Sequence, residues 1–197
     1  MINLSCLVLA AGDSSRMGAP KALLVYNGET FMSRVCAAAK SASAEIIVIA
    51  GKHHHEITAT LPPGVKSAVN PAPEGGMISS VRVGLGAVNQ SASGVIISLV
   101  DQPFVGAEIY AAMAAAHAET PDRVIIPRFR GRKRGHPIVL PKSALPLCFE
   151  GPDNLGLHWV THHPSVFVRD IDFETDCIIR DVDTPQDYQN ITQEKSV

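Results

Sequence analysis

The chain has 197 residues and a formal net charge of −2, with 46% hydrophobic and 18% charged residues. This length and balance are typical of one globular domain with a substantial core. The near-neutral charge and the 5% aromatic content argue against a nucleic-acid partner, and no apolar stretch is long enough to cross a membrane.

The four cysteines are widely separated and form no Cys-x-x-Cys pair (Cys6, Cys36, Cys148 and Cys177). Small buried thiols in a reducing compartment are therefore expected rather than a zinc ribbon or a thioredoxin-like site. The short apolar N-terminal run has no basic region before it, which argues against a signal peptide. We expect a cytoplasmic protein with one domain over residues 1–192 and a frayed polar tail over residues 193–197.

Apolar runs and helical segments alternate along the chain. Strands are predicted where apolar residues are continuous, at Leu4–Ala10, Glu45–Ala50, Val65–Val69, Gly94–Val100, Val124–Ile126 and Ile138–Leu140. Helices are predicted at Thr30–Ala42, His54–Leu61, Ile78–Val88, Ala107–Ala118 and Thr184–Asn190, the last with Thr184 as its N-cap. This alternation predicts an α/β domain with a mostly parallel sheet covered on both faces. Binding sites in such sheets lie at the carboxyl ends of the strands.

The segment after the first predicted strand is suited to binding phosphate. Small residues at positions 10–12 let backbone N–H groups approach a polyphosphate, and Arg16 and Lys21 add two cations. The glycines have neither the Walker spacing nor the dinucleotide Gly-x-Gly-x-x-Gly spacing. The segment is therefore either a different kind of nucleotide loop or an ordinary strand-to-helix turn.

Two aspartates follow apolar runs on the same expected edge of the sheet. Asp101 comes directly after the strand Gly94–Val100, where a carboxylate is well placed to hold Mg²⁺ together with phosphate oxygens. Asp183 lies in the sequence Asp-Val-Asp-Thr-Pro and is either a second metal contact or part of a helix-capping turn.

A third block, from Asn70 to Leu85, follows the strand Val65–Val69. Its hydroxyls and backbone donors at a helix start suit a nucleotide, whereas Met77, Val81 and Leu85 have the spacing of core residues. The ligand contacts predicted in this block are Asn70, Gly76, Ser79 and Ser80.

The segment 128–137 is strongly basic, with five cationic residues in ten. In a slightly acidic protein this favours an anionic partner, such as an acceptor that carries a phosphate group. Because the basic run is short and framed by glycines, a nucleic-acid surface is the weaker alternative, and a solvated loop without function is another. Arg134 and His136 are the predicted acceptor-side residues.

These blocks together resemble the molybdenum-cofactor nucleotidyltransferases, whose first loop contains Leu-Ala-Ala-Gly, Arg-Met-Gly and Lys in this order. The matching residues here are Leu9, Ala10, Ala11, Gly12, Arg16, Met17, Gly18 and Lys21. Four further segments also match the family: the one at Asp101, Asp-x-Asp-Thr-Pro, Gly-Met-x-x-Ser-Val-Arg-x-Gly and Arg-Gly-His-Pro. The similarity therefore extends to about Tyr188.

The resemblance implies a three-layer Rossmann-like nucleotidyltransferase fold and a Mg²⁺-dependent transfer of a nucleotidyl group from a nucleoside triphosphate to molybdopterin, with release of pyrophosphate. It implies that Asp101, and Asp183 if it is a ligand, hold Mg²⁺, and that Arg16 and Lys21 bind the β- and γ-phosphates. The first loop has alanine at position 11, and in this respect it is similar to the loop of the class that uses CTP rather than GTP. A molybdoenzyme or its chaperone is a further expected partner.

One segment departs from the family pattern. Where Gly-Asp-x-Gly-Ala-Arg is expected after the basic loop, residues 151–156 read Gly-Pro-Asp-Asn-Leu-Gly and the arginine is missing. Two alternatives to a molybdopterin cytidylyltransferase therefore stay open. One is a transferase for another phosphorylated acceptor, such as a sugar phosphate, and the other is a non-catalytic protein that binds and delivers the cofactor.

Overall fold

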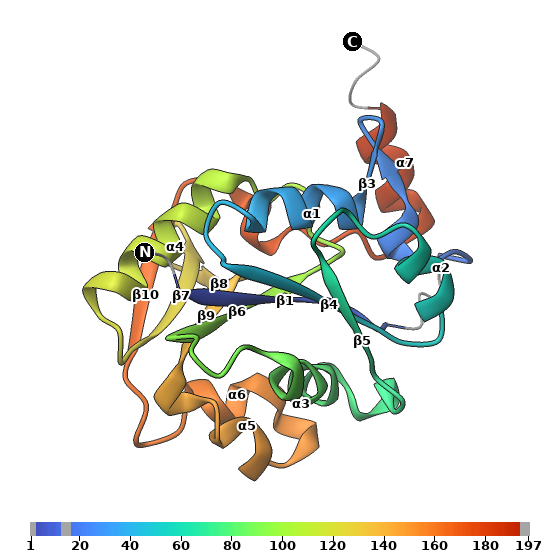
Figure 1. Cartoon of the computed structure of the whole chain (residues 1–197). Coiled ribbons are helices and arrows are strands. Elements are labelled where there is room, and N and C mark those ends of the chain that lie inside the picture. The colour runs from blue at the N-terminus through green and yellow to red at the C-terminus, as the bar shows by residue number, and fades with distance from the viewer. Residues whose placement is uncertain (1–2, 13–16, 194–197) are drawn as a thin grey trace.

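The most apolar predicted strands form the middle of an eight-stranded sheet in the computed structural model, which describes residues 3–12 and 17–193 (Figure 1). The strand order is β10-β7-β9-β6-β1-β4-β5, and β8 pairs with β7. The strands are β1 (Leu4–Ala10), β4 (Glu45–Ala50), β5 (Lys66–Val69), β6 (Gly94–Leu99), β7 (Val124–Phe129), β8 (Lys133–Arg134), β9 (Ile138–Pro141) and β10 (Val168–Phe173). Within this sheet, as far as the structure describes the chain, only the pairings of β8 and β9 are antiparallel, so the expected mostly parallel sheet is confirmed.

Helices cover both faces of this sheet, which gives three layers (Figure 1). Helices α1 and α4 pack on one face, and α3, α5 and α6 pack on the other. The helices are α1 (Phe31–Ala39), α2 (His54–Ala59), α3 (Met77–Ala87), α4 (Ala107–Glu119), α5 (Leu147–Glu150), α6 (Gly156–Thr161) and α7 (Pro185–Gln193). The last helix includes Gln193, and the rest of the expected tail lies outside the described residues.

The two faces of β1 supply two separate parts of the core. Cys6 and Val8 pack among residues of α1 and α4, while Leu7 and Leu9 pack among residues of α3. Because successive side chains of a strand point to opposite faces, a strand buried on both sides needs apolar residues throughout. The continuous apolar run Leu4–Ala10 meets this requirement, and its predicted bounds are those of β1.

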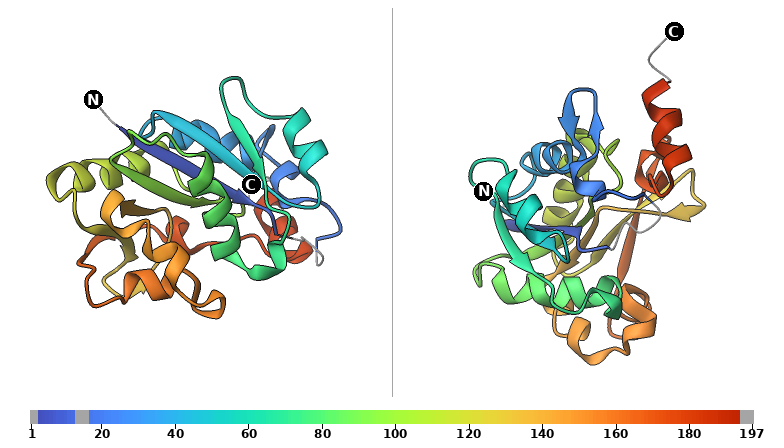
Figure 2. Two further views of the ribbon diagram at one scale, coloured as in Figure 1. Left: turned by 60° about the horizontal axis from the view of Figure 1, so that its bottom comes forward. Right: turned by 90° about the vertical axis from the view of Figure 1, so that its right-hand side faces the viewer.

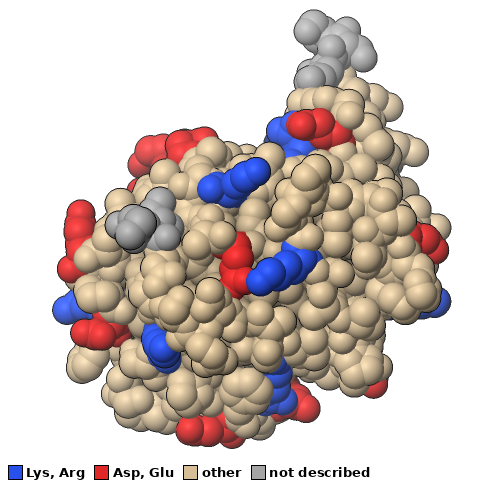
Figure 3. All heavy atoms as spheres, viewed as in Figure 1, with Lys and Arg blue, Asp and Glu red and all other residues tan. Residues whose placement is uncertain are grey.

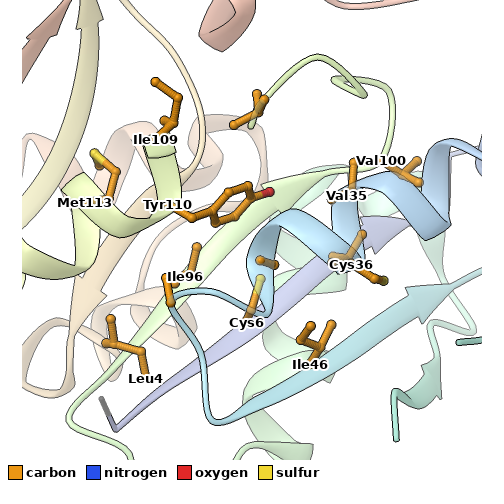
Figure 4. Packing of buried hydrophobic residues seen from close by; sticks show 14 of the residues in the cluster. Leu4, Cys6, Val35, Cys36, Ile46, Ile96, Val100, Ile109, Tyr110 and Met113 are labelled. Atoms are coloured by element: carbon orange, nitrogen blue, oxygen red, sulfur yellow. The ribbon is translucent and has the colours of Figure 1, made fainter. Parts of the chain in front are cut away.

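All four cysteines are buried free thiols, as the sequence predicts. Figure 4 shows Cys6 and Cys36 within the α1–α4 core, near Tyr110. Burial raises the pKa of Cys36 to about 12 and that of Cys148 to about 11, so these thiols stay protonated at neutral pH.

A small hairpin and the last helix form an extension beside the main sheet (Figures 1 and 2). The hairpin pairs β2 (Val25–Tyr26) with β3 (Glu29–Thr30), and the Tyr188 hydroxyl of α7 donates to the Val25 carbonyl at 2.8 Å. Phe31, Val182 and Ile191 are buried together beneath them. This packing fixes the segment that leads into α7. Among the described residues, no helix combines the length and hydrophobicity that crossing a bilayer requires.

Two glycines of α3 differ in their surroundings and give a test of the packing against β1. A Cβ at Gly84 would lie 2.5 Å from Leu7 Cδ1 and 3.1 Å from Ile49 Cδ1, whereas a Cβ at Gly86 would have nothing within 4 Å. We expect Gly84→Ala to lower the free energy of unfolding by about 1–3 kcal/mol through overpacking. Gly86→Ala should raise it by up to about 1 kcal/mol through helix propensity. Denaturant titrations of the two variants check this, and equal effects would contradict the close contact at Gly84.

Candidate active site

The opening loop lies against the end of the neighbouring strand. Ala11 is buried, and a Cβ at Gly51, just after β4, would lie only 2.6 Å from the Ala11 carbonyl oxygen. Gly51 is therefore needed for the two strand ends to approach so closely. Leu9 and Ala10 complete β1, and Gly12 follows at the edge. Arg16, a predicted phosphate ligand, lies outside the described residues.

Lys21, Asp101 and Asp183 meet at the carboxyl-end edge of the sheet. The Lys21 Nζ donates to Asp101 Oδ2 at 2.9 Å and to Asp183 Oδ1 at 2.5 Å. The two carboxylate segments are also joined through the backbone, because the Val182 N–H donates to the Asp101 carbonyl at 2.9 Å. From the sequence, Lys21 was expected to bind phosphate and the two aspartates were expected to bind a metal ion. The sequence did not indicate that Lys21 contacts the aspartates.

The electrostatics of this cluster are set by burial and by excess negative charge. Burial opposes the charge on Lys21, but its hydrogen bonds to Asp183 and Asp101 outweigh this effect and raise the pKa of the ammonium. Burial, followed by the neighbouring charges of Asp101 and Asp183, raises the pKa of Asp181, which accepts a hydrogen bond from Gln102 Nε2 at 2.7 Å. Two carboxylates therefore contact one ammonium, which makes this a site suited to a cation of higher charge.

The donor set fits a hard divalent cation. Two oxygen atoms, from Asp101 and Asp183, converge on the point that the Lys21 ammonium occupies. Among the described residues, no group of three or more His, Cys, Asp or Glu could hold a metal ion. A cation here would therefore need ligands from a substrate, as Mg²⁺ does when it is bound by one or two carboxylates plus phosphates.

Helix α7 begins with a reciprocal cap. The Asp187 N–H donates to Thr184 Oγ1, and the Thr184 N–H donates to Asp187 Oδ2 at 2.8 Å. Thr184 is thus the N-cap that the sequence predicts. Asp183 does not accept the capping bonds at this turn, and its Oδ1 atom points to Lys21 instead.

The predicted nucleotide residues of the third block form an internal network. Asn70 is buried, and its Nδ2 donates to Ser79 Oγ at 2.8 Å and to Ser80 Oγ at 3.0 Å, while its Oδ1 accepts from the Ala72 N–H. Gly76 has a φ of +76° and lies just before α3. The side chain of Asn70 therefore fixes the loop from which Gly76 and Ser79 face outward, and direct ligand contact by these residues remains a prediction.

A pocket of about 890 Å³ lies at the start of α3. It is bounded by the Gly75–Met77 turn, by Arg134 and His136 of the basic segment, and by residues 153–158. Burial lowers the pKa of His136 to about 4, opposed by the charge of Asp101, so the ring is neutral at physiological pH. Its Nε2 atom is buried without a hydrogen-bond partner. His136 is also joined to the segment that leads to Asp181 and Asp183, because its N–H donates to the Ile178 carbonyl at 2.9 Å.

Three of the four arginines of the basic segment form ion pairs within the protein. Arg128 donates to Asp172 at 2.8 Å, and Arg134 makes a paired contact with both oxygens of Asp170 at 2.7 and 3.0 Å. Arg130 contacts Glu174 in the same row. On the face of the molecule that Figure 3 shows, charges of both signs are interspersed. These ion pairs with β10 and its following residue reduce the free positive charge that the sequence indicated.

The segment that departs from the family pattern is anchored by Arg82 of α3. The Arg82 guanidinium donates to the Cys148 carbonyl at 2.7 Å, to the Gly151 carbonyl at 2.8 Å and to Asp153 Oδ1 at 2.5 Å. Sequence reasoning missed this role, although Arg82 lies in the Ser-Val-Arg motif beside the predicted contacts Ser79 and Ser80. Arg82 thus ties the segment that forms one wall of the pocket to helix α3.

The model of the MobA-like NTP transferase domain matches residues 6–164. The chain belongs to this family. It is therefore a nucleotidyltransferase-family protein, and such enzymes typically use a divalent metal ion. The resemblance stated from the sequence is confirmed, and so is the Rossmann-like α/β fold.

Curated relatives and solved structures agree with this family. A probable molybdenum cofactor guanylyltransferase of Rhodopirellula baltica is 28% identical over 190 residues, with 92% of this chain and 88% of that protein covered. The molybdenum cofactor cytidylyltransferase of Escherichia coli is 25% identical, with 95% of each covered. The crystal structure of Rv0371c from Mycobacterium tuberculosis superposes with a TM-score of 0.85 at 26% identity and covers 96% of this chain and 98% of that one. A second structure of Rv0371c is described as a complex with manganese.

Proposed function

We propose that the protein transfers CMP from CTP to the phosphate of molybdopterin, or of its metal-loaded form, in a reaction that depends on Mg²⁺ and releases pyrophosphate. The observation that carries the proposal is the meeting of Lys21, Asp101 and Asp183 at one edge of the sheet. The opening loop lies at this edge, and the pocket lined by His136 also contains Gly76, so donor and acceptor are proposed to bind next to each other beside the charged cluster.

The chemistry needs positioning and charge neutralisation rather than a protein nucleophile. An oxygen of the acceptor phosphate attacks the α-phosphorus, the bond from this phosphorus to the bridging oxygen of the β-phosphate breaks, and pyrophosphate leaves. Asp101 and Asp183 would hold Mg²⁺, which when bound offsets negative charge on the phosphates. Arg16 and Lys21 would bind the β- and γ-phosphates and stabilise the leaving group.

The choice of CTP rests on the opening loop. With alanine at position 11, this loop resembles that of the class that uses CTP. The N–H groups of the segment that contains Leu9, Ala10, Ala11 and Gly12 are proposed to approach the nucleotide. The relatives include both guanylyl- and cytidylyltransferases at similar identity, which makes this residue the basis of the choice. Gly76, Ser79 and Ser80, held by Asn70, are proposed to border the base and ribose.

The acceptor is proposed to bind in the pocket lined by Arg134 and His136. Because His136 is neutral and its Nε2 atom lacks a partner, a modest movement of the ring would let it accept a hydrogen bond from the acceptor. The pocket wall at 153–156 lacks the arginine of the family pattern, which favours another phosphorylated acceptor as the second candidate.

Pyrophosphate release tests the proposal. The protein is incubated with Mg²⁺, either CTP or GTP, and either molybdopterin or a panel of sugar phosphates. Turnover with CTP and molybdopterin that stops on addition of EDTA is the expected result. Turnover with GTP but not with CTP would overturn the choice of nucleotide. Turnover with a sugar phosphate but not with molybdopterin would overturn the choice of acceptor. Tight molybdopterin binding without pyrophosphate from any combination would favour a delivery protein.

Arg82 is expected to position the acceptor wall rather than take part in the transfer. Arg82→Ala removes the three contacts to residues 148–153, and we expect the KM for the acceptor to rise about tenfold, equivalent to about 1.4 kcal/mol. The KM for CTP should change less than about twofold, because the nucleotide is proposed to bind elsewhere. Initial rates with each substrate varied in turn measure this split. Arg123→Ala, at an exposed site, is the control, and equal changes in both KM values would contradict the role.

A further inference from the structure

The Lys21 ammonium lies at the point where a divalent cation would bind Asp101 and Asp183. The Lys21 ammonium bridges Asp101 and Asp183, residues 80 and 162 positions away in the chain. The side chain of Lys21 is 15% exposed, so the ammonium is largely enclosed by the site. The same carboxylate oxygens are the ones that fit a divalent cation.

An ammonium and a divalent cation cannot use these oxygens together. The Lys21 Nζ lies 2.5 and 2.9 Å from them, and a cation such as Mg²⁺ would need to approach to about 2.0–2.1 Å from the same atoms. Like charges at such separations repel strongly in a partly buried site. Entry of the cation therefore requires the ammonium to leave.

The Lys21 side chain is long and flexible enough for its ammonium to move. Lys21 begins a short 3-10 turn (Lys21–Leu23) that follows the opening loop, and a lysine is a compact charge on a flexible four-carbon stem. In the exchange proposed below, this stem turns toward the phosphates of the nucleotide.

We propose that Lys21 serves as a resident counter-ion that holds the metal-binding carboxylates together until a divalent cation and a nucleoside triphosphate arrive. With a divalent cation held by Asp101 and Asp183, the Lys21 ammonium would leave these oxygens and bind the phosphates. The protein alone therefore binds metal weakly, and metal and nucleotide bind in a coupled manner. The second half of this exchange rests on the proposed nucleotidyl transfer, whereas the first half concerns only Lys21, Asp101 and Asp183.

Mn²⁺ binding in the absence of nucleotide tests the exchange. We expect Lys21→Met, which removes the ammonium and keeps most of the stem, to bind Mn²⁺ roughly tenfold more tightly than the wild type, within the usual range for linked sites. Lys21→Arg keeps a competing cation and should bind Mn²⁺ about as weakly as the wild type. Electron paramagnetic resonance of free Mn²⁺ gives the affinities. Unchanged or weaker binding by Lys21→Met would overturn the proposal.

The double variant Lys21→Met/Asp101→Asn shows whether the added affinity belongs to this site. It should lose the gain, and retention of the gain would overturn the proposal, because Mn²⁺ would then be bound elsewhere. These outcomes do not depend on catalysis. If no acceptor supported pyrophosphate release, tighter Mn²⁺ binding by Lys21→Met would still support the exchange.

Amine labelling of the wild-type protein covers the case in which Lys21→Met does not fold. Reductive methylation followed by mass spectrometry reports how accessible each lysine is. Saturating Mn²⁺ should increase labelling of Lys21 several-fold relative to the exposed Lys40. Equal labelling of Lys21 with and without Mn²⁺ would overturn the displacement.

Discussion

Replacing Asp101 with alanine is expected to reduce pyrophosphate release from CTP and molybdopterin by on the order of a thousandfold, because metal-ion charge stabilisation contributes several kcal/mol. Asp101 is one of two carboxylates that converge on the proposed cation position. Asp101→Asn should lose a similar factor, since the amide keeps the shape and one acceptor but loses the charge. Steady-state rates at saturating Mg²⁺ measure both variants.

The fold should survive these substitutions. The Asp101 side chain is 24% exposed and its hydrogen bond is to Lys21, which keeps Asp183 as a second partner. We therefore expect the melting temperature to fall by no more than a few degrees, as for the loss of one partly exposed ion pair. Asp122→Ala, at an exposed site before β7, is the control and should keep full activity. A normal rate in Asp101→Ala would remove this residue from the mechanism.

Strands buried on both faces were the easiest elements to predict. The predicted bounds of β1 and β4 agree with the structure at both ends, because every position in these runs packs against a helix layer or a neighbouring strand. The predicted strand at Val124–Ile126 is correct but too short, since β7 continues through Pro127 and Arg128 to Phe129. Its last residues are half-buried, and hydrophobicity alone does not identify them as strand.

Strand β10 was missed for a related reason. Arg169, Asp170 and Asp172 interrupt its apolar residues, so Val168–Phe173 has no continuous run. The structure explains these charges, because β10 lies at the edge of the sheet in parallel register with β7 and places Asp172 opposite Arg128. The charges of the two strands pair with each other. The basic segment looked unpartnered in the sequence because its carboxylate partners lie about 40 positions further along the chain.

The candidate site could be predicted as an edge of the sheet but not as a set of contacts. Strand order places the residues after β1 and β6 at the same edge, which is why the opening loop and Asp101 could be linked from sequence. No pattern in the chain indicates that Lys21 bridges Asp101 and Asp183, or that Arg82 reaches the 151–153 segment. Such contacts depend on side-chain conformations and on how α7 and α5 pack, which single-residue motifs do not encode.

Gly135→Ala is expected to damage both stability and activity, although alanine is the smallest possible side chain. A Cβ at Gly135 would overlap the Ile178 carbonyl oxygen and lie 2.7 Å from the Ile178 carbonyl carbon and 2.9 Å from Ile179 Cγ2. Backbone atoms cannot turn aside as a side-chain end can, so the basic segment and the Asp176–Ile179 turn must separate. We expect a loss of about 1–3 kcal/mol in the free energy of unfolding.

The effect on activity follows from where these two segments lead. The His136 N–H donates to the Ile178 carbonyl at 2.9 Å, so the displacement moves the histidine that lines the pocket. The Asp176–Ile179 turn runs directly into Asp181 and Asp183, which places the other side of the disturbance at the carboxylate cluster. Gly135→Ala should therefore raise the KM for the acceptor and lower kcat together. Gly131→Ala is the matched control, because a Cβ there meets nothing within 4 Å and only the positive φ is strained. If the two variants showed the same melting temperature and the same kinetics, the close approach of Gly135 to Ile178 would not be what holds this part of the site in place.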